Sequence, residues 1–436
     1  MSDAISSAED GMRSSQVRTG TVRTGAWVLY DLANTIYIAT VTFVFTPHAK
    51  AELGGLTGHG VTNFLSMVAA AFLVPFFGAL VDTTSRTSRY LTIATLLCIA
   101  ALFGWYFDFG AFWLLACYFA ANLAYNVALV FYNSLLTSVA VPERAGRLSS
   151  IGVGVGYMGT LLVLAITMTA HPSPRTFFVI AAGLFLLLAL PCMLLVKDRR
   201  PPQPSSVSAR VAMRDANQRL WQTLRDLPKH PPLMWFLVGN FFLVDVLNTA
   251  ILYFAEFTKS VFAEQAAHGI RLFGTTFTGQ QGIDSFMGIA GICLNVIAML
   301  VGILIGAWND RSPLTVMRVS AVALFVALIG GAVFGGNNPL AYLATLVALG
   351  AFGLTGIWSA GRKIIVVLAP PEQIGQYFGL YGITIKLSVF GAVIYSLVSD
   401  SYGSKPAMLA QSAQLLIGLL CLFMVRLPDK QTATTS

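Results

Sequence analysis

Twelve long apolar stretches dominate the sequence and constrain its fold more than any other feature. A helix needs about 20 mainly apolar residues to cross the hydrocarbon core of a bilayer. Stretches of roughly that length recur along the whole chain, separated by short polar segments. We therefore predict an all-α polytopic membrane protein with twelve transmembrane helices, near residues 25–46, 61–81, 90–107, 111–139, 148–170, 175–196, 233–257, 282–307, 314–335, 339–368, 376–399 and 406–426.

The charge content supports this prediction. Only 11% of the 436 residues are charged, whereas soluble domains carry about 25%, so the chain has too few charges to cover two soluble domains. The net charge of +8 does not indicate nucleic-acid binding, because the basic residues lie in short segments between apolar stretches, where they orient membrane proteins. We expect the lipid bilayer as the surroundings and no nucleic acid as a partner.

The distribution of Lys and Arg predicts the topology. Basic residues gather in the two tails and in every second connecting segment, above all in 197–232, while the opposite side holds Lys50, Arg175, Lys259, Arg271 and Lys405. The positive-inside rule then places both termini in the cytoplasm. The expected organisation is a cytoplasmic tail at 1–24, a six-helix bundle at 25–196, a cytoplasmic linker at 197–232, a second bundle at 233–427 and a tail at 428–436.

The linker has a basic amphipathic piece at 207–227. This piece either lies in the membrane interface, with arginines towards lipid phosphates, or is a solvated helix. The first apolar stretch is of full spanning length, and no short hydrophobic segment with a cleavage site precedes it. We therefore expect no removable signal peptide.

Three short motifs recur in the same order in the two halves of the chain. Asp31-Leu-Ala-Asn34-Thr35 returns as Asp245-Val-Leu-Asn248-Thr249, Gly78-Ala-x-x-Asp82 returns as Gly306-Ala-x-x-Asp310, and Pro142-Glu143-x-x-Gly146 returns as Pro371-Glu372-x-x-Gly375. Each motif occupies an equivalent place along its half. The repeat predicts two six-helix halves related by duplication.

The segment Gly78-Ala-Leu80-Val-Asp82-Thr-Thr-Ser85-Arg86 resembles the loop motif between helices two and three of the major facilitator superfamily. Within that superfamily the chain resembles the branch of autophagy-related vacuole amino-acid effluxers. The matching segments are Tyr30-Asp31-Leu-Ala-Asn34, Tyr132-Asn133-Ser-Leu-Leu and Phe378-Gly379-Leu-Tyr381-Gly382-x-x-x-Lys386. The resemblance implies two bundles whose first, fourth, seventh and tenth helices line a central cavity, with amino acids or similar metabolites as substrates and export as the direction.

Polar and ionisable side chains inside the apolar stretches are the candidates for binding a solute or a proton. A charge at the middle of a bilayer costs about 2.5–3.5 kcal/mol on insertion scales, so such residues are functional candidates. The eight candidates are Asp31, Asn34, Tyr37, Asn133, Asp245, Asn248, Arg362 and Lys386.

Each charged candidate also has a structural interpretation. Asp31 and Asp245 are placed either to face each other across the solute path or to make hydrogen bonds that hold helices together. Lys386 has three interpretations: it binds a carboxylate-bearing substrate, pairs with Asp245, or extends towards the interface. Arg362 is the repeat counterpart of Asn133. It binds a carboxylate, forms a salt bridge that closes the cytoplasmic side, or serves only as a positive charge on the cytoplasmic side of its span.

A second group of residues is expected to control conformation. Gly78, Asp82 and Arg86 belong to the loop motif, and Asp310 and Arg311 are at the equivalent place in the second half. We expect these charged groups to interact with one another and with helix ends, and to stabilise the state that is open to the outside.

The sequence has no motif typical of an enzyme, a nucleotide-binding loop or a metal site, and its five cysteines all lie within apolar stretches. We predict no enzyme activity, no cofactor and no metal. The predicted function is secondary active or facilitative transport of a small solute by a monomer in a bacterial inner membrane, with protons as a candidate coupling ion. The alternatives are a proton-coupled drug or nutrient importer and a membrane sensor of the same fold that does not transport.

Overall fold

The computed structural model describes residues 2–54, 57–198, 225–388 and 390–427, together with 214, 218 and 221–223, with side chains described from Gly20 onward. Within this part of the chain, twelve helices are long and apolar enough to span a membrane. The prediction of a helical, polytopic membrane protein is therefore confirmed. The predicted tail at 428–436 and most of the amphipathic piece at 207–227 lie outside the described residues.

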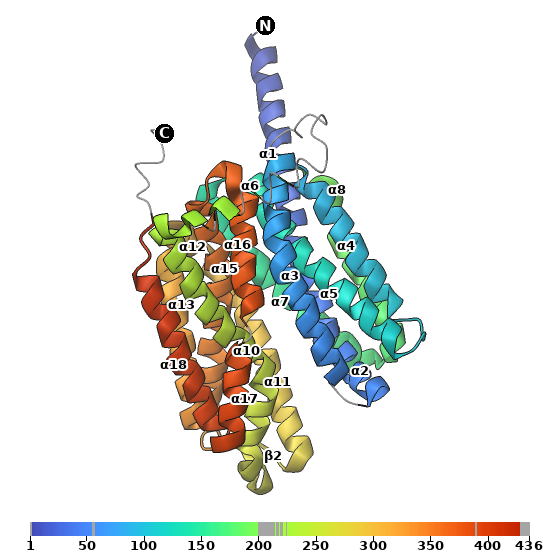
Figure 1. Ribbon diagram of the computed structural model, residues 1–436, viewed down its shortest axis with the longest axis vertical. Helices are drawn as coiled ribbons and strands as arrows, with labels where there is room; N and C mark the ends of the chain where they lie inside the picture. Colours follow the sequence, from blue (N-terminus) through green and yellow to red (C-terminus); the bar gives the residue numbers. More distant parts are fainter. Residues whose placement is uncertain are drawn as a thin grey trace.

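Six spans form the N-terminal bundle, which is coloured blue to green in Figure 1. The first span comprises α1 (Ser2–Thr40), a π-helical segment (Val41–Phe45) and α2 (Thr46–Leu53); α3 (Thr57–Thr84) and α4 (Thr87–Gly104) follow; α5 (Ala111–Ser134) continues into α6 (Leu136–Val139); and α7 (Ala145–Ala170) and α8 (Pro174–Leu195) complete the bundle. The helix α1 begins well before residue 25, so the expected N-terminal tail is helical from Ser2 and projects beyond the bundle (Figure 1).

The other six spans form the C-terminal bundle, coloured yellow-green to red. They comprise α10 (Pro231–His268); α11 (Gly279–Leu304) with α12 (Gly306–Arg311); α13 (Pro313–Phe334); α14 (Pro339–Tyr342), a π-helical segment (Leu343–Leu349) and α15 (Gly350–Leu368); α16 (Ile374–Leu387) with α17 (Phe390–Tyr402); and α18 (Ser404–Phe423).

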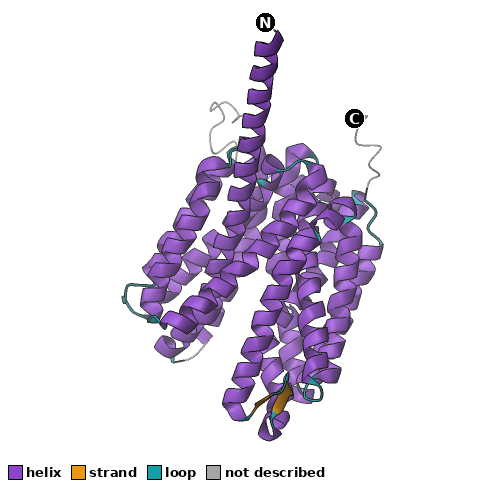
Figure 2. Cartoon of the chain, turned by 180° about the vertical axis from the view of Figure 1, so that it is seen from behind, coloured by secondary structure: helices purple, strands orange, loops and turns teal. Residues whose placement is uncertain are grey.

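A short hairpin between α10 and α11 is an element that the sequence analysis does not predict. The strands β1 (Ile270–Leu272) and β2 (Thr275–Phe277) pair antiparallel, with Leu272 opposite Thr275. The two residues between them, Phe273 and Gly274, have φ angles of 47° and 81°. Positive φ at both central positions is typical of a type I′ turn, whose twist matches that of the two hairpin strands. The hairpin lies outside the spans, at the end of the molecule opposite the termini (Figure 2).

The two bundles meet at the end of the molecule where α1 begins and α18 ends, and they diverge towards the opposite end (Figures 1 and 2). We call the first end the termini side. The N-terminal bundle contributes α3 and α7 to this contact, and the C-terminal bundle contributes α16 and α11. The arrangement is therefore a termini-side-closed state of two bundles.

Glycines allow the bundles to approach closely along both contacts. A Cβ atom on Gly78 of α3 would collide with the carbonyl oxygen of Gly375 in α16, and a Cβ atom on Gly375 would collide with that of Gly78. On the other side, a Cβ atom on Gly302 of α11 would lie 2.5 Å from the Cα atom of Gly154 in α7. Small residues permit such backbone contact between membrane helices. The glycine-rich faces of α7 and α16 are thus packing surfaces.

Candidate functional site

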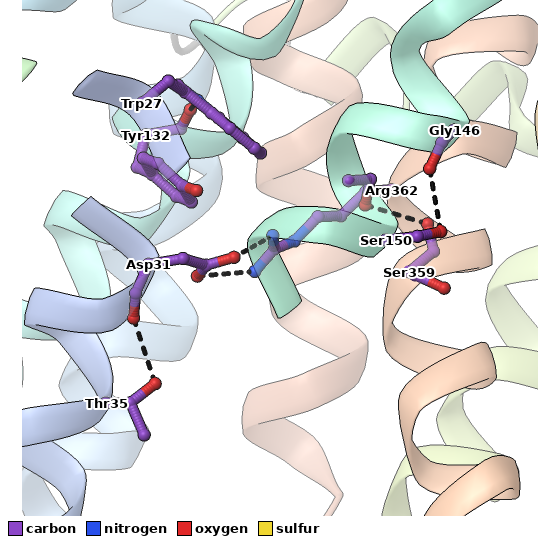
Figure 3. Close-up of polar contacts among 9 residues, drawn as sticks. Trp27, Asp31, Thr35, Tyr132, Gly146, Ser150, Ser359 and Arg362 are labelled. Atoms are coloured by element: carbon purple, nitrogen blue, oxygen red, sulfur yellow. Dashed lines mark hydrogen bonds and ion pairs between the residues drawn. The ribbon is translucent and has the colours of Figure 1, made fainter. Parts of the chain in front are cut away.

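A buried ion pair joins the two bundles. In α15, Arg362 donates from Nη1 to Oδ2 of Asp31 at 2.7 Å and from Nη2 to Oδ1 at 3.2 Å, and Asp31 belongs to α1 of the other bundle (Figure 3). The exposed fractions are 6% for Asp31 and 9% for Arg362. A bidentate guanidinium–carboxylate pair fixes orientation as well as charge. The ion pair therefore ties the two bundles together in this state.

The residues around the ion pair leave space for the Asp31 carboxylate and place aromatic rings next to the Arg362 guanidinium. Gly152 of α7 faces α1, and a Cβ atom at this position would lie 2.8 Å from Oδ2 of Asp31. The rings of Trp27 and Tyr132 stack with centroids 4.4 Å apart, and the guanidinium carbon of Arg362 lies 5.5 Å from the Tyr132 centroid and 5.9 Å from that of Trp27. A cation over aromatic faces is favourable where water is excluded. The aromatic stack thus stabilises Arg362 where it meets Asp31.

Several polar atoms of the predicted site residues and of Tyr381 are buried and have no hydrogen-bond partner among the described residues. They are both amide atoms of Asn34, the hydroxyl of Tyr37, Oδ1 of Asn133, Oδ1 of Asp245 and the hydroxyl of Tyr381. Asn34 and Tyr37 lie along α1 beyond Asp31, towards the end where the bundles diverge. Buried polar groups are normally paired. Tyr37 packs against other aromatic rings within the N-terminal bundle, whereas Asn34 follows Asp31 by one helical turn and the Tyr381 hydroxyl lies against Gly361, next to Arg362. The groups of Asn34 and Tyr381 are therefore suited to bind a polar ligand or water.

Asp245 has a different environment from its repeat counterpart Asp31. Its Oδ2 accepts hydrogen bonds from the backbone N–H of Gly391 at 2.7 Å and from Nε2 of Gln414 at 2.5 Å. Gln411 in turn donates to the carbonyl of Gly391 at 3.0 Å. These contacts connect α10, α17 and α18, so Asp245 holds the C-terminal bundle together instead of reaching across to the other one.

The same contacts lie where the eleventh span, predicted as one helix over 376–399, divides into two helices. Its first part, α16, ends at Leu387, and its second part, α17, begins at Phe390. The N–H of Gly391 is bonded to Asp245 in place of a carbonyl one turn earlier. A carboxylate at the N-terminus of a helix satisfies its free N–H groups and its dipole.

Two further predicted residues have no partner among the residues that the structure describes. Lys386, in the last turn of α16, is 8% exposed and does not pair with Asp245. Asn248 is half-buried in α10. The alternative in which Lys386 forms an ion pair with Asp245 is therefore not the arrangement found here.

The acidic residues of the conformational group cap helices of the opposite bundle. Asp82, at the end of α3, accepts from the N–H groups of Gly375 at 2.9 Å and Gln376 at 2.7 Å, in the first turn of α16. Asp310, at the end of α12, accepts from the N–H of Arg147 at 2.8 Å, in the first turn of α7. The repeat thus places a carboxylate from each bundle on a helix N-terminus of the other, where the dipole favours it.

Arg86 and Arg311, the basic members of the conformational group, do not form the expected interactions with its acidic members. Arg86 is half-buried and Arg311 is exposed. Neither has an ion-pair partner within the described ranges. Carboxylate caps and glycine contacts close the termini side, and neither arginine contributes an ion pair with a described residue.

Replacing Asp82 with alanine is expected to weaken the termini-side-closed state. The loss of a charged cap costs about 1–2 kcal/mol, so the population open at the termini side should rise about tenfold. Distances between spin labels at Arg89→Cys and Thr315→Cys, two exposed positions at that side, would measure it in a cysteine-free background. Asp226→Ala is the control, because its exposed carboxylate contacts Lys229 at 2.7 Å within the same segment. An unchanged distance distribution for Asp82→Ala would contradict the prediction.

Two residues of the site, Trp27 and Gly152, emerge only from the tertiary structure, and a third, Tyr381, lies in a segment that the sequence analysis matches to the family. Trp27 precedes Asp31 by one helical turn, which is a signal in the sequence, but its stacking on Tyr132 is a contact between spans. Gly152 belongs to a glycine-rich stretch whose packing role is predictable, although its contact with Asp31 is not. Tyr381 carries an unpartnered hydroxyl that lies against Gly361, the residue before Arg362.

Comparison with known proteins identifies the family. The sequence model described as "Vacuole effluxer Atg22 like" matches residues 60–434. A Bacillus subtilis protein called "Uncharacterized MFS-type transporter YxiO" is 24% identical, with 95% of this chain and 97% of that protein aligned. "Autophagy-related protein 22-1" of Aspergillus niger is 26% identical, and the match covers 64% of this chain but only 47% of the longer fungal protein.

Solved structures show the same fold at low sequence identity. The human organic anion transporter MFSD10 has a TM-score of 0.67 at 15% identity, with 93% of this chain and 99% of that chain covered. A bacterial homologue of the iron transporter ferroportin, in an outward-facing state, has a TM-score of 0.68 at 15% identity, with 92% and 98% covered. The paired six-helix bundles and the sequence match agree: the chain is a multi-pass membrane transporter of the major facilitator superfamily and belongs to its Atg22-like vacuole effluxer family.

Proposed function

We propose that the protein exports a small polar solute, an amino acid or a similar metabolite, by alternating access across a bacterial inner membrane. The observation that carries the proposal is the buried Asp31–Arg362 ion pair between the bundles, near polar groups that have no hydrogen-bond partner among the described residues. Opening the termini side requires this pair to separate. Separating a buried pair leaves two uncompensated charges, and a bound polar solute or a proton on Asp31 would lower that cost.

The orientation follows from charge. Basic residues concentrate on the side of the termini, so the positive-inside rule places the termini side in the cytoplasm. The conformation described here is then open to the outside. Rocking of two rigid bundles about the central ion pair would expose the same site to the cytoplasm. We take the transporter to act as a monomer, because each chain contains both bundles.

Counterflow in proteoliposomes tests the proposal. Vesicles holding the protein are loaded in turn with unlabelled amino acids and related metabolites, and uptake of the labelled counterpart is followed. Counterflow needs no imposed gradient, so it reports transport before the coupling ion is known. We expect exchange by the native protein and at least a hundredfold slower exchange by Asp31→Asn.

The matched control is Asp284→Asn, because Asp284 is an exposed carboxylate that contacts Lys259 at 2.7 Å, away from the bundle contact. It should exchange at the native rate. Absence of exchange for every solute, from protein shown to be folded, would overturn the proposal and favour the sensor alternative. A proton gradient that drives uptake would reverse the direction and favour an importer.

A further inference from the structure

Lys386 faces the N-terminal bundle. It follows Gly375, Gly379 and Gly382 along α16 at spacings of four, three and four residues, which places all four on one helical face. That face packs on α3, since a Cβ atom at Gly379 would lie 2.8 Å from Cα of Pro75 and one at Gly382 would lie 2.5 Å from Cγ1 of Val74. Lys386 lies one helical turn beyond Gly382, in the last turn of α16 and further from the termini side.

No acidic group in the described part of the chain compensates this lysine. Its side chain makes no hydrogen bond or ion pair with a described residue, although it is 8% exposed. The two buried carboxylates of the spans are engaged elsewhere: Asp31 by Arg362 and Asp245 by Gly391 and Gln414. The other buried lysine of this bundle, Lys363, donates to the carbonyl of Pro142. Lys386 is therefore a buried cation without an acidic partner among the described residues.

The buried ion pair is balanced, whereas Lys386 is not. Asp31 and Arg362 compensate each other's charge, and Lys386 has no acidic partner among the described residues. A lysine inside a membrane span persists where it pairs or lines water. A solute anion is a partner that would enter and leave with each transport cycle.

We propose that Lys386 is the anchor for an anionic group of the transported solute, and that the transporter selects carboxylates with net negative charge over zwitterions and cations. The inference rests on the transport function proposed above and names its substrate class. An ammonium group suits this task because it is a compact point charge that can follow the solute as the bundles rock. The amide of Asn34, beyond Asp31 on α1, has no partner among the described residues and is available to orient the rest of the solute.

The test compares solutes that differ in charge. Counterflow is measured with pyruvate and L-glutamate as anions, L-alanine as a zwitterion and L-lysine as a cation. The native protein should exchange an anion at least tenfold faster than L-alanine and L-lysine. Lys386→Met should abolish that preference and weaken anion binding at least thirtyfold, as measured by ligand-dependent thermal stabilisation, whereas Lys386→Arg should retain it.

Lys259→Met is the control, because Lys259 is an outer lysine already paired with Asp284, and it should keep the native preference. Native exchange restricted to L-lysine or L-alanine, or an anion preference that survives in Lys386→Met, would overturn the inference while leaving transport intact. Exchange of no solute by folded native protein would overturn transport itself. If Lys386→Met does not fold, competition among the four solutes for the native protein and for Lys386→Arg decides the charge preference.

Discussion

Arg362→Ala is expected to reduce solute exchange at least a hundredfold. The substitution leaves the carboxylate of Asp31 buried at 6% exposure, without the two hydrogen bonds at 2.7 and 3.2 Å that now satisfy it. Breaking one side of a buried ion pair costs about 3–5 kcal/mol. It also removes the cation that lies over Tyr132 and Trp27. Counterflow rate and thermal stability would be measured on the same preparations.

A double-mutant cycle separates the effect of the ion pair on transport from its effect on folding stability. Asp31→Asn and Arg362→Gln should each destabilise the protein, while the double variant should be more stable than either, because it leaves no uncompensated charge. Transport by the double variant should still be lost, because the double variant lacks the charged groups that the solute is proposed to compensate when the ion pair separates. Arg318→Ala is the matched arginine control: Arg318 donates to the carbonyls of Leu422 and Val425 within the C-terminal bundle. Native exchange rates in Arg362→Ala would refute the role given to the pair.

Gly78→Ala is expected to prevent the termini side from closing. The new methyl group would collide with the carbonyl oxygen of Gly375 in the facing helix α16, where backbone meets backbone and no flexible side chain can yield. Overpacking of this kind costs about 1–3 kcal/mol or more. The bundles should therefore separate at the termini side, and exchange should fall at least tenfold because one half of the cycle is disfavoured.

The same spin-label pair, at Arg89→Cys and Thr315→Cys, would report that separation as a longer distance. Gly183→Ala in α8 is the control, because a Cβ atom there meets nothing within 4 Å. Gly375→Ala should reproduce the effect of Gly78→Ala, since its Cβ atom would collide with the carbonyl oxygen of Gly78. Native distances and rates in both variants would show that the glycines are not required for closure.

The internal repeat predicts equivalent contacts for one pair of aspartates but not for the other. It correctly relates Asp82 to Asp310, and both cap a helix of the opposite bundle. It also relates Asp31 to Asp245, yet Asp31 pairs across the bundles while Asp245 bonds to Gly391 and Gln414 within one bundle. Duplicated residues keep their place on a helix, but their partners diverge because the surrounding helices differ in sequence.

The sequence by itself determined the twelve spans, the two-bundle architecture and the family, because burial in lipid demands long apolar helices and duplication leaves recurring motifs. It also placed Asp31, Asn34, Tyr37, Asn133, Arg362 and Lys386 inside spans. Only the tertiary structure decided that Arg362 pairs with Asp31, that Asp245 bonds to the first turn of α17 and that Lys386 has no acidic partner among the described residues. The physical reason is that a side chain's charge is compensated by neighbours distant in sequence, and those are set by helix packing.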